Sequence, residues 1–432
     1  MDLTAVLGST VDETVKGMPG GMAAVSLADV GAQGWNVSAG DLPLPLLVAR
    51  RTALTHNLEL MARYCDESGA LLAPHGKTTM SPQLFAEQLT HGAWGITAAS
   101  VQQIQVYRAA GVPRIVLANE VADPAGLRYL TQELARDPAF DFYCWVDSVA
   151  GVEALATAAR EHGLERPFQV LVEIGWPGGR TGARDDAAVD AVVAAIAAHP
   201  GLVSLVGVSV FEGLLGLDRV APGVAGGAAQ GPDVHEFLAR AAATAQRLRD
   251  DGALPDGYLL SGGGSTAFDA VVAAFGAVAG ARLLLRSGCY VTHDHGMNAA
   301  LSPLSASNDT PARDRLGALR PALELWCTVN STPEAGLAML ACGRRDAPYD
   351  AGLPVPLWGI AAATGERLDL SGAEVVGLND QHGYLRTGAQ QLAVGDRVVL
   401  GISHPCTAFD KWQVIPVVDD DDNVIDAIRT YF

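Results

Sequence analysis

Eight short, apolar, strand-like runs alternate with Ala-rich helical patterns through the first two thirds of this chain. The runs are Ala70–Ala73, Trp94–Ala98, Arg114–Asn119, Phe142–Val146, Phe168–Ile174, Leu205–Phe211, Gly257–Ser261 and Arg282–Arg286. Between them lie helical patterns such as Ser81–His91, Ser100–Ala110 and Asp185–Ala198. Strands that alternate with helices form parallel sheets, and eight repeats predict a (β/α)8 barrel of the TIM type. An open, doubly wound sheet is the alternative, and the count of eight favours the barrel.

After about residue 305 the pattern changes, because helical periodicity fades and Gly, Pro and short strand-like runs take over. The runs are Glu324–Val329, Val375–Leu378, Arg397–Ile402 and Trp412–Val418. Residues 1–45 are also non-periodic, and Pro43 and Pro45 precede the barrel. We therefore predict a barrel domain over residues 46–304 and a β-rich domain made of residues 1–45 and 305–432.

The composition favours a protein with a large core and without a nucleic-acid or membrane partner. Of 432 residues 49% are hydrophobic and 18% charged, and the net charge is -19 with no basic run. Nucleic-acid binding needs clustered Lys and Arg, and a membrane span needs about 18 apolar residues in a row. The N-terminus lacks a basic segment, so we expect no signal peptide. Six scattered cysteines are typical of reduced thiols. We expect a cytoplasmic protein with a small-molecule substrate.

A lysine stands just beyond the first strand-like run, in the segment Ala73-Pro74-His75-Gly76-Lys77-Thr78-Thr79. A strand that ends there would hold the ammonium group of Lys77 at the mouth of a site. A desolvated lysine can lose its proton and form a Schiff base with a carbonyl. An isolated lysine is more often a solvated loop residue, so this interpretation depends on the rest of the chain.

Two small, donor-rich loops follow the seventh and eighth runs. They are Ser261-Gly262-Gly263-Gly264-Ser265-Thr266 and Ser287-Gly288-Cys289-Tyr290. Glycines free backbone N–H groups to bind an anion, and Ser and Thr add hydroxyl donors. Barrels commonly bind phosphate with the loops after strands seven and eight. Together with Lys77, these loops predict pyridoxal phosphate as the cofactor.

An arginine lies in the Gly-rich segment that follows the fifth run, Glu173 to Gly182. The glycines would let Arg180 fold back over the barrel mouth. A guanidinium group there suits the O3′ of the cofactor or a substrate carboxylate.

The segment Ser403-His404-Pro405-Cys406 contains a candidate metal pair. If it is extended, His404 and Cys406 point to one face, and an imidazole with a thiolate suits zinc. His382 is a candidate further ligand. The pair His293 and His295 invites an amidohydrolase interpretation, but that family places such a pair on the first strand, whereas this one follows the eighth.

Taken together, these motifs resemble the D-serine dehydratase and D-threonine aldolase group, over about residues 45 to 415. That group comprises fold-type III pyridoxal phosphate enzymes with an alanine-racemase-like barrel and a C-terminal β domain. The segment Pro74–Thr78 resembles its P-H-x-K-T motif, and Arg180 to Gly182 resembles its R-x-G motif. The resemblance implies that Tyr290 faces the cofactor and that His404 and Cys406 bind the metal. Phe211 departs from the tyrosine that relatives often carry.

The resulting site prediction has one catalytic residue, Lys77. The predicted cofactor-binding residues are Lys77, Arg180, Gly262, Gly263, Gly264, Ser265, Thr266, Gly288, Cys289 and Tyr290. The predicted metal ligands are His404 and Cys406.

The resemblance implies two reactions that share these residues. In the dehydratases the metal pair resembles His-x-Cys with zinc, so Cys406 favours β-elimination of a D-β-hydroxy amino acid such as D-serine to a 2-oxo acid and ammonia. Lys77 would remove the α-proton, and zinc would assist departure of the hydroxyl group. The alternative is a D-threonine-type aldolase that yields glycine and an aldehyde. A racemase, a non-enzymatic pyridoxal phosphate carrier and a metallohydrolase without cofactor are further alternatives. Resemblance also implies a homodimer.

Overall fold

A computed structural model describes residues 1–215 and 231–432, which divide into two compact units. The barrel unit comprises residues 62–77 and 85–288 with Met1, and the β unit comprises residues 2–61, 78–84 and 289–432. Residues 46–50, which begin the predicted barrel range, form strand β3 (Leu46–Arg50) and pair with strands of the β unit. Among the described residues, every helix is too short or too polar to cross a membrane.

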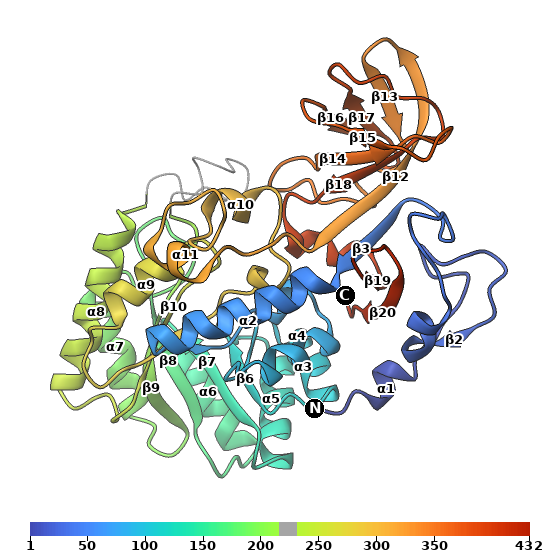
Figure 1. Cartoon of the computed structure of the whole chain (residues 1–432). Coiled ribbons are helices and arrows are strands. Elements are labelled where there is room, and N and C mark those ends of the chain that lie inside the picture. The colour runs from blue at the N-terminus through green and yellow to red at the C-terminus, as the bar shows by residue number, and fades with distance from the viewer. Residues whose placement is uncertain (216–230) are drawn as a thin grey trace. The chain divides into compact units, whose positions relative to one another are not determined.

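The barrel unit is built on eight parallel strands (Figure 1). They are β4 (Leu71–Leu72), β5 (Ile96–Ala98), β6 (Arg114–Leu117), β7 (Asp141–Val146), β8 (Phe168–Ile174), β9 (Val203–Val210), β10 (Leu259–Gly262) and β11 (Arg282–Leu285). Their order is β4-β11-β10-β9-β8-β7-β6-β5. The sheet closes because the chain beyond β4 also pairs with β5: Trp94 donates to the carbonyl of Leu72, and His75 bridges to Thr97. All eight predicted strands are therefore confirmed, and so is the barrel.

Helix α2 precedes the first of these strands, and further helices alternate with the strands along the chain (Figure 1). They are α2 (Arg51–Ser68), α3 (Pro82–Thr90), α4 (Val101–Ala109), α5 (Pro124–Arg136), α6 (Val149–Glu161), α7 (Asp186–Ala197), α8 (Val234–Asp250) and α9 (Phe268–Phe275). Side chains of Ser100, Asp123, Ser148, Asp185 and Asp233 accept hydrogen bonds from the first turns of their helices, which is the usual N-cap arrangement. Ala73, Val116, Tyr143, Trp145, Leu171, Leu259 and Leu284 form a buried apolar cluster.

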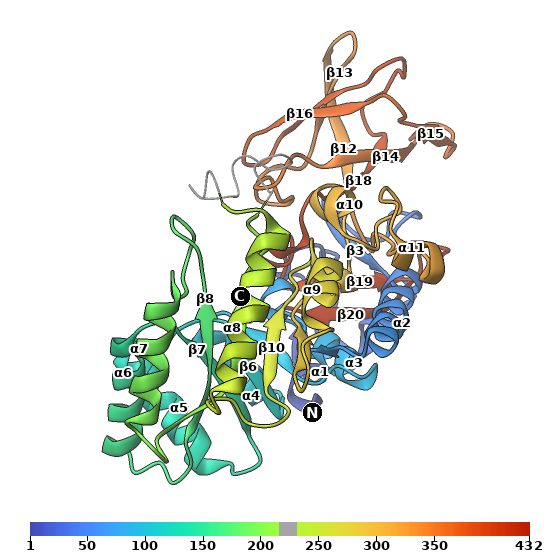
Figure 2. The ribbon, with the colours of Figure 1, turned by 90° about the vertical axis from the view of Figure 1, so that its left-hand side faces the viewer.

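The β unit is a mainly antiparallel assembly, part of which is seen in Figure 2. Its strands are β1 (Thr10–Val11), β2 (Val25–Ser26), β3, β12 (Leu323–Glu334), β13 (Leu337–Leu340), β14 (Val355–Ile360), β15 (Arg367–Asp369), β16 (Glu374–Leu378), β17 (Gly383–Arg386), β18 (Arg397–Gly401), β19 (Val414–Val418) and β20 (Val424–Arg429). The long strand β12 pairs with β3, β13 and β18 and so links the sheet together. Short helices α1 (Thr4–Leu7), α10 (Met297–Leu301) and α11 (Pro311–Leu316) complete the unit. The predicted β-rich part of the fold is confirmed.

Candidate active site

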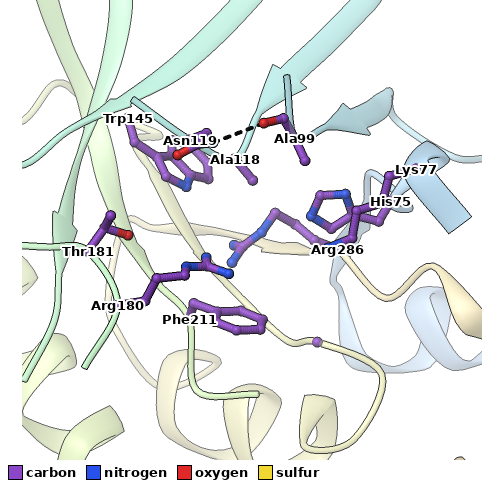
Figure 3. Close-up of a pocket in the computed structure, with 11 residues that line it drawn as sticks. His75, Lys77, Ala99, Ala118, Asn119, Trp145, Arg180, Thr181, Phe211 and Arg286 are labelled. Carbon is purple, nitrogen blue, oxygen red and sulfur yellow. Dashed lines mark hydrogen bonds between the residues drawn. The ribbon is translucent and has the colours of Figure 1, made fainter. Parts of the chain in front are cut away.

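A cavity of about 240 Å³ lies at the mouth of the barrel, and each of the eight strands, or the loop after it, contributes to its wall. The lining residues are His75, Lys77, Ala99, Ala118, Asn119, Trp145, Arg180, Thr181, Phe211, Gly264 and Arg286 (Figure 3). All of them end a strand or follow one, so the cavity lies at the carboxyl ends of the strands, where barrel enzymes carry their active sites. Lys77, Arg180 and Gly264 are the predicted site residues that the structure brings together here.

Lys77 lies in a short 3-10 turn, Gly76–Thr78, beyond the residues that close the barrel. Pro74 and His75 still pair with β5, so the chain leaves the barrel wall immediately before the lysine. Its side chain is half-buried and lines the cavity. The sequence contains two other lysines, Lys16 and Lys411, and both pair with aspartates in the β unit. Lys77 therefore lines the cavity at the barrel mouth, and its chemical role stays a prediction.

Three cations and two aromatic rings dominate the cavity wall. The guanidinium carbon of Arg180 is 4.3 Å from the ring centroid of Phe211, and that of Arg286 is 5.4 Å from a ring of Trp145. In Figure 3 the two guanidinium groups point toward each other across the cavity. Such contacts hold guanidinium planes against aromatic faces. Cations beside flat apolar surfaces suit a flat, anionic ligand.

Arg286 is a site residue that sequence reasoning missed. It is only 4% exposed, donates to the carbonyl of Val210 at 2.6 Å, and also donates to the hydroxyl of Ser261. Burial lowers the pKa of Arg286, while nearby carboxylates of Glu212 and Glu173 act in the opposite direction. The sequence feature that could have indicated this role is a charged residue at the end of the eighth apolar run. A residue at that position lies at the carboxyl end of the strand, next to the barrel mouth.

His75 is a second residue that sequence reasoning left without a role. Burial and the three cations of the cavity hold the pKa of His75 well below its usual value, so the ring is neutral. Its Nδ1 atom is buried and has no hydrogen-bond partner among the described residues. A buried polar atom without a partner is uncommon in folded proteins.

The backbone N–H groups of the predicted phosphate loop after β10 bind a carboxylate side chain of the protein itself. The N–H groups of Gly263 and Gly264 donate to the buried carboxylate of Glu212 at 3.2 and 2.7 Å. Gly263 has a φ of +80°, a conformation that favours glycine, and a Cβ atom there would lie 2.5 Å from the side chain of Leu285. Binding of phosphate by this loop stays a prediction. Gly262, Gly263 and Gly288 are buried, and Ser265 and Thr266 are half-buried.

Glu120, next to the cavity residue Asn119, faces a buried carboxylate. Burial and the nearby carboxylates of Glu173 and Asp147 raise the pKa of Glu120 to about 8. Glu173 is buried, and each of the two glutamates has a side-chain oxygen without a partner among the described residues. The pair therefore retains a proton at neutral pH.

We expect the substitution Glu120→Gln to stabilise the protein at alkaline pH. The pKa of Glu120 rises from 4.5 to about 8 on folding, so the folded protein holds a proton that the unfolded chain releases between these values. Stability therefore falls as pH rises through this window and levels off above it. A glutamine has no charge to lose and can donate to Glu173. Unfolding curves at several pH values should show a flatter profile for the variant, with a difference on the order of 4 kcal/mol near pH 8. The exposed Glu165→Gln variant is the control, and parallel profiles for all three proteins would refute the expectation.

A group of potential metal ligands lies in the β unit. The ligand atoms of Cys289, His404 and Cys406 all lie within 4.8 Å of one another. The condition set for their convergence, an extended Ser403–Cys406 segment, is not met, because Pro405–Thr407 forms a 3-10 turn. The two predicted ligands nevertheless converge, because the turn brings Cys406 back toward His404. Cys289, predicted to be in a phosphate loop, also has its thiol in this group.

The imidazole of His404 is oriented by a carboxylate. Its Nδ1 atom lies 2.8 Å from Asp350 Oδ2, and the other oxygen of Asp350 accepts from the hydroxyl of Thr407. Burial opposes a charged ring, but the hydrogen bonds to Asp350 and Cys406 raise the pKa of His404 to about 10. A carboxylate that holds one ring nitrogen leaves Nε2 for a metal, as in many zinc sites.

We expect Asp350→Asn to weaken metal binding about 10- to 100-fold, which is typical for loss of a carboxylate behind a ligating histidine. Competition with a chromophoric chelator measures this on protein without substrate. Asp369→Asn is the matched control, because Asp369 is exposed and its carboxylate, within residues 1–215 and 231–432, accepts hydrogen bonds from Ser371 alone. Equal affinity in the Asp350→Asn variant and the control would contradict a role for Asp350.

The other candidate histidines do not join this group among the described residues. His382 is exposed. His293 is buried and His295 is half-buried, and the Asp294 between them accepts hydrogen bonds from the N–H groups of Asn298 and Ala299 at helix α10. The segment His293–His295 thus precedes helix α10, whose first N–H groups donate to Asp294, and the amidohydrolase interpretation gains no support.

Comparison with known proteins matches both parts of the chain. Residues 50–275 match the model of the alanine racemase N-terminal domain, and residues 322–418 match that of a serine dehydratase domain. D-threonine aldolase from Arthrobacter sp. is 30% identical over 381 residues, which are 87% of this chain and 89% of the relative. D-threo-3-hydroxyaspartate dehydratase from Delftia sp. is 34% identical over 145 residues, which are 34% of this chain and 37% of the relative. The crystal structure of D-threonine aldolase from Filomicrobium marinum has a similar fold, with a TM-score of 0.73, 23% identity, and coverage of 92% of this chain and 97% of that one.

The barrel, the lysine at its mouth and the added β domain define an alanine-racemase-like enzyme fold of the pyridoxal phosphate type. The chain belongs to the D-serine dehydratase and D-threonine aldolase family of fold-type III pyridoxal phosphate enzymes. Its relatives in that family are lyases.

The cavity fits this cofactor by its chemistry. The amine of Lys77 suits the aldehyde, the arginines suit its anionic groups, and the faces of Trp145 and Phe211 suit its flat ring. The thiolate and imidazole donors of the β unit suit zinc, which prefers nitrogen and sulfur ligands.

Proposed function

We propose that this protein eliminates water from a D-amino acid with a β-hydroxyl group, such as D-serine, and yields a 2-oxo acid and ammonia. The observation that carries the proposal is that the thiol of Cys406 lies beside His404 in a chain whose barrel mouth holds Lys77. Lys77 and Thr78 are consecutive, and the hydroxyl of Thr78 lies 3.4 Å from the thiol of Cys406. Because Lys77 directly precedes Thr78 in the chain, this contact supports a role for the amine of Lys77 and the thiol of Cys406 in one reaction.

Residues of the cavity would bind the substrate and move its proton. When bound, pyridoxal phosphate supplies an electron sink for the bonds at the α-carbon. The amine of Lys77 would take the α-proton as general base. The exposed guanidinium of Arg180 suits the substrate carboxylate, and the buried Arg286 would keep the cavity wall cationic. The neutral ring of His75 would add an uncharged surface to the cavity wall.

Residues of the β unit would assist the leaving group. A zinc ion held by His404 and Cys406 would supply Lewis acidity to the β-hydroxyl, which departs as water after gaining a proton. The soft thiolate of Cys406 favours zinc over a hard ion such as manganese. Asp350 would hold the imidazole of His404 in the ligating orientation.

The second candidate is retro-aldol cleavage of a D-threonine-type substrate to glycine and an aldehyde. The match to D-threonine aldolase over 87% of the chain favours it. The same lysine, arginine and metal ligands would serve, but the Cα–Cβ bond would break and a base would take the hydroxyl proton. We further expect, as part of the proposal, a homodimer that acts in the cytoplasm.

A product assay separates the two candidates. The purified protein with pyridoxal phosphate and zinc would be offered D-serine, D-threonine, D-3-hydroxyaspartate and D-phenylserine. Formation of a 2-oxo acid with ammonia is the expected result. Glycine with an aldehyde would show an aldolase instead. Neither product, from protein that still binds the cofactor, would contradict both and favour a racemase or a carrier.

A further inference from the structure

The thiol of Cys289 lies beside the predicted metal pair. Cys289 begins the 3-10 turn Cys289–Val291, and its Sγ atom is 3.5 Å from Sγ of Cys406. The nearest ligand atoms of Cys289, Cys406 and His404 form one group within 4.8 Å. The two cysteines are 117 positions apart in the sequence, so no local motif reveals this arrangement.

The distance between the two sulfur atoms fits a shared metal ion. A disulfide requires sulfur atoms about 2.05 Å apart, which is much shorter than the observed 3.5 Å. Two thiolates that each bind a tetrahedral zinc ion at about 2.3 Å lie about 3.8 Å apart. The thiols are therefore already close to the spacing that zinc imposes.

His404, the third member of the group, is oriented so that it can bind the same ion. Asp350 holds Nδ1 of His404, so Nε2 is the nitrogen that remains for a metal. Cys289 is only 7% exposed, which keeps its sulfur away from bulk water. A buried cysteine on its own is more often a packing residue; two thiols and an oriented imidazole within one ligand sphere are a metal-binding arrangement.

We propose that Cys289 is a third protein ligand, so that two thiolates and one imidazole hold the metal ion and one coordination position stays open. Two thiolates neutralise the charge of a divalent ion, which strengthens binding of zinc and disfavours manganese and magnesium. One open position accepts a single oxygen atom at a time, as a Cys2His catalytic zinc site does. That oxygen would be the β-hydroxyl, and this last point alone rests on the proposed function.

Counting sulfur ligands on the resting protein tests the proposal. The reduced wild-type protein would be loaded with zinc and studied by X-ray absorption at the zinc edge, without substrate. Two sulfur ligands and one imidazole nitrogen are expected. A single sulfur ligand, or no stoichiometric zinc in the reduced protein, would overturn the proposal.

Replacing zinc with cobalt in the wild-type protein and in variants gives a second measurement of the sulfur ligands. The near-ultraviolet thiolate-to-cobalt absorption should fall by about half in Cys289→Ser, and zinc affinity in chelator competition should fall at least about 10-fold, as for loss of a ligand or of its supporting group. Cys65→Ser is the matched control, because Cys65 is also a buried thiol with 7% exposure and lies outside the group. Unchanged absorption and affinity in a folded Cys289→Ser variant would refute the assignment. Neither measurement uses turnover. If Cys289 proved not to be a ligand, the dehydratase proposal would still stand. If the protein proved not to be a dehydratase, the assignment of Cys289 would still stand.

Discussion

Replacing Lys77 with alanine is expected to abolish both turnover and the covalent link to pyridoxal phosphate. In our proposal the variant would lose both the amine that reacts with the cofactor aldehyde and the base that takes the α-proton. General-base catalysis alone contributes roughly 10²- to 10⁴-fold, so activity should fall by at least about 10³-fold. Loss of visible cofactor absorbance and loss of product formation are the measurements.

The matched variants separate chemistry from charge. Lys77→Arg keeps the cation in the cavity but cannot supply the amine, so it should be as inactive as Lys77→Ala. Lys411→Ala removes a lysine that pairs with Asp410 and should leave activity unchanged. Because the sequence has only three lysines, borohydride labelling followed by peptide mapping would identify the reacting one directly. A label on Lys16 or Lys411 would contradict the assignment.

Replacing Cys406 with alanine is expected to remove most activity while the cofactor absorbance stays. The thiol belongs to the metal group of the β unit, whereas the cavity that fits the cofactor is lined by residues of the barrel unit. Loss of Lewis-acid assistance worth several kcal/mol should lower kcat roughly 10²- to 10³-fold. The bound zinc would be quantified on the same sample.

Chelation provides the companion measurement for Cys406. Removal of zinc from the wild-type protein should reproduce the defect, and added zinc should restore the wild-type protein far better than the variant. The Cys65→Ala variant controls for loss of a buried thiol elsewhere. Full activity of Cys406→Ala in the presence of a chelator would show that the metal has no catalytic role.

The barrel could be predicted from the sequence because each strand and helix is a local pattern. The eight apolar runs correspond to β4 through β11, and polar capping residues such as Ser100 and Asp185 start the following helices. Parallel strands alternating with helices have few ways to pack, so the count of eight was sufficient for the barrel. Lys77 and Arg180 could be placed at the mouth because both follow strands at their carboxyl ends.

Other parts of the site depend on contacts between residues far apart in sequence. Arg286 ends a strand, and its role became visible only through its bonds to Val210 and Ser261. The carboxylate of Glu212 accepts hydrogen bonds from two N–H groups of the glycine loop, which no spacing rule predicts. The i, i+2 argument for His404 and Cys406 assumed an extended segment, and the 3-10 turn at Pro405–Thr407 shows that the ligands converge by a different backbone path.

By itself the sequence determined the barrel, the strand-end lysine and the presence of an imidazole and a thiolate close together in the chain. These features follow from periodicity and from short-range spacing, which the local backbone enforces. Only the tertiary structure decided that Cys289 joins that pair, that Asp350 orients His404 and that Glu120 and Glu173 share a buried environment. Such groups meet because separate strands and turns fold onto one another, and ligand geometry and buried charge depend on distances that sequence separation does not specify.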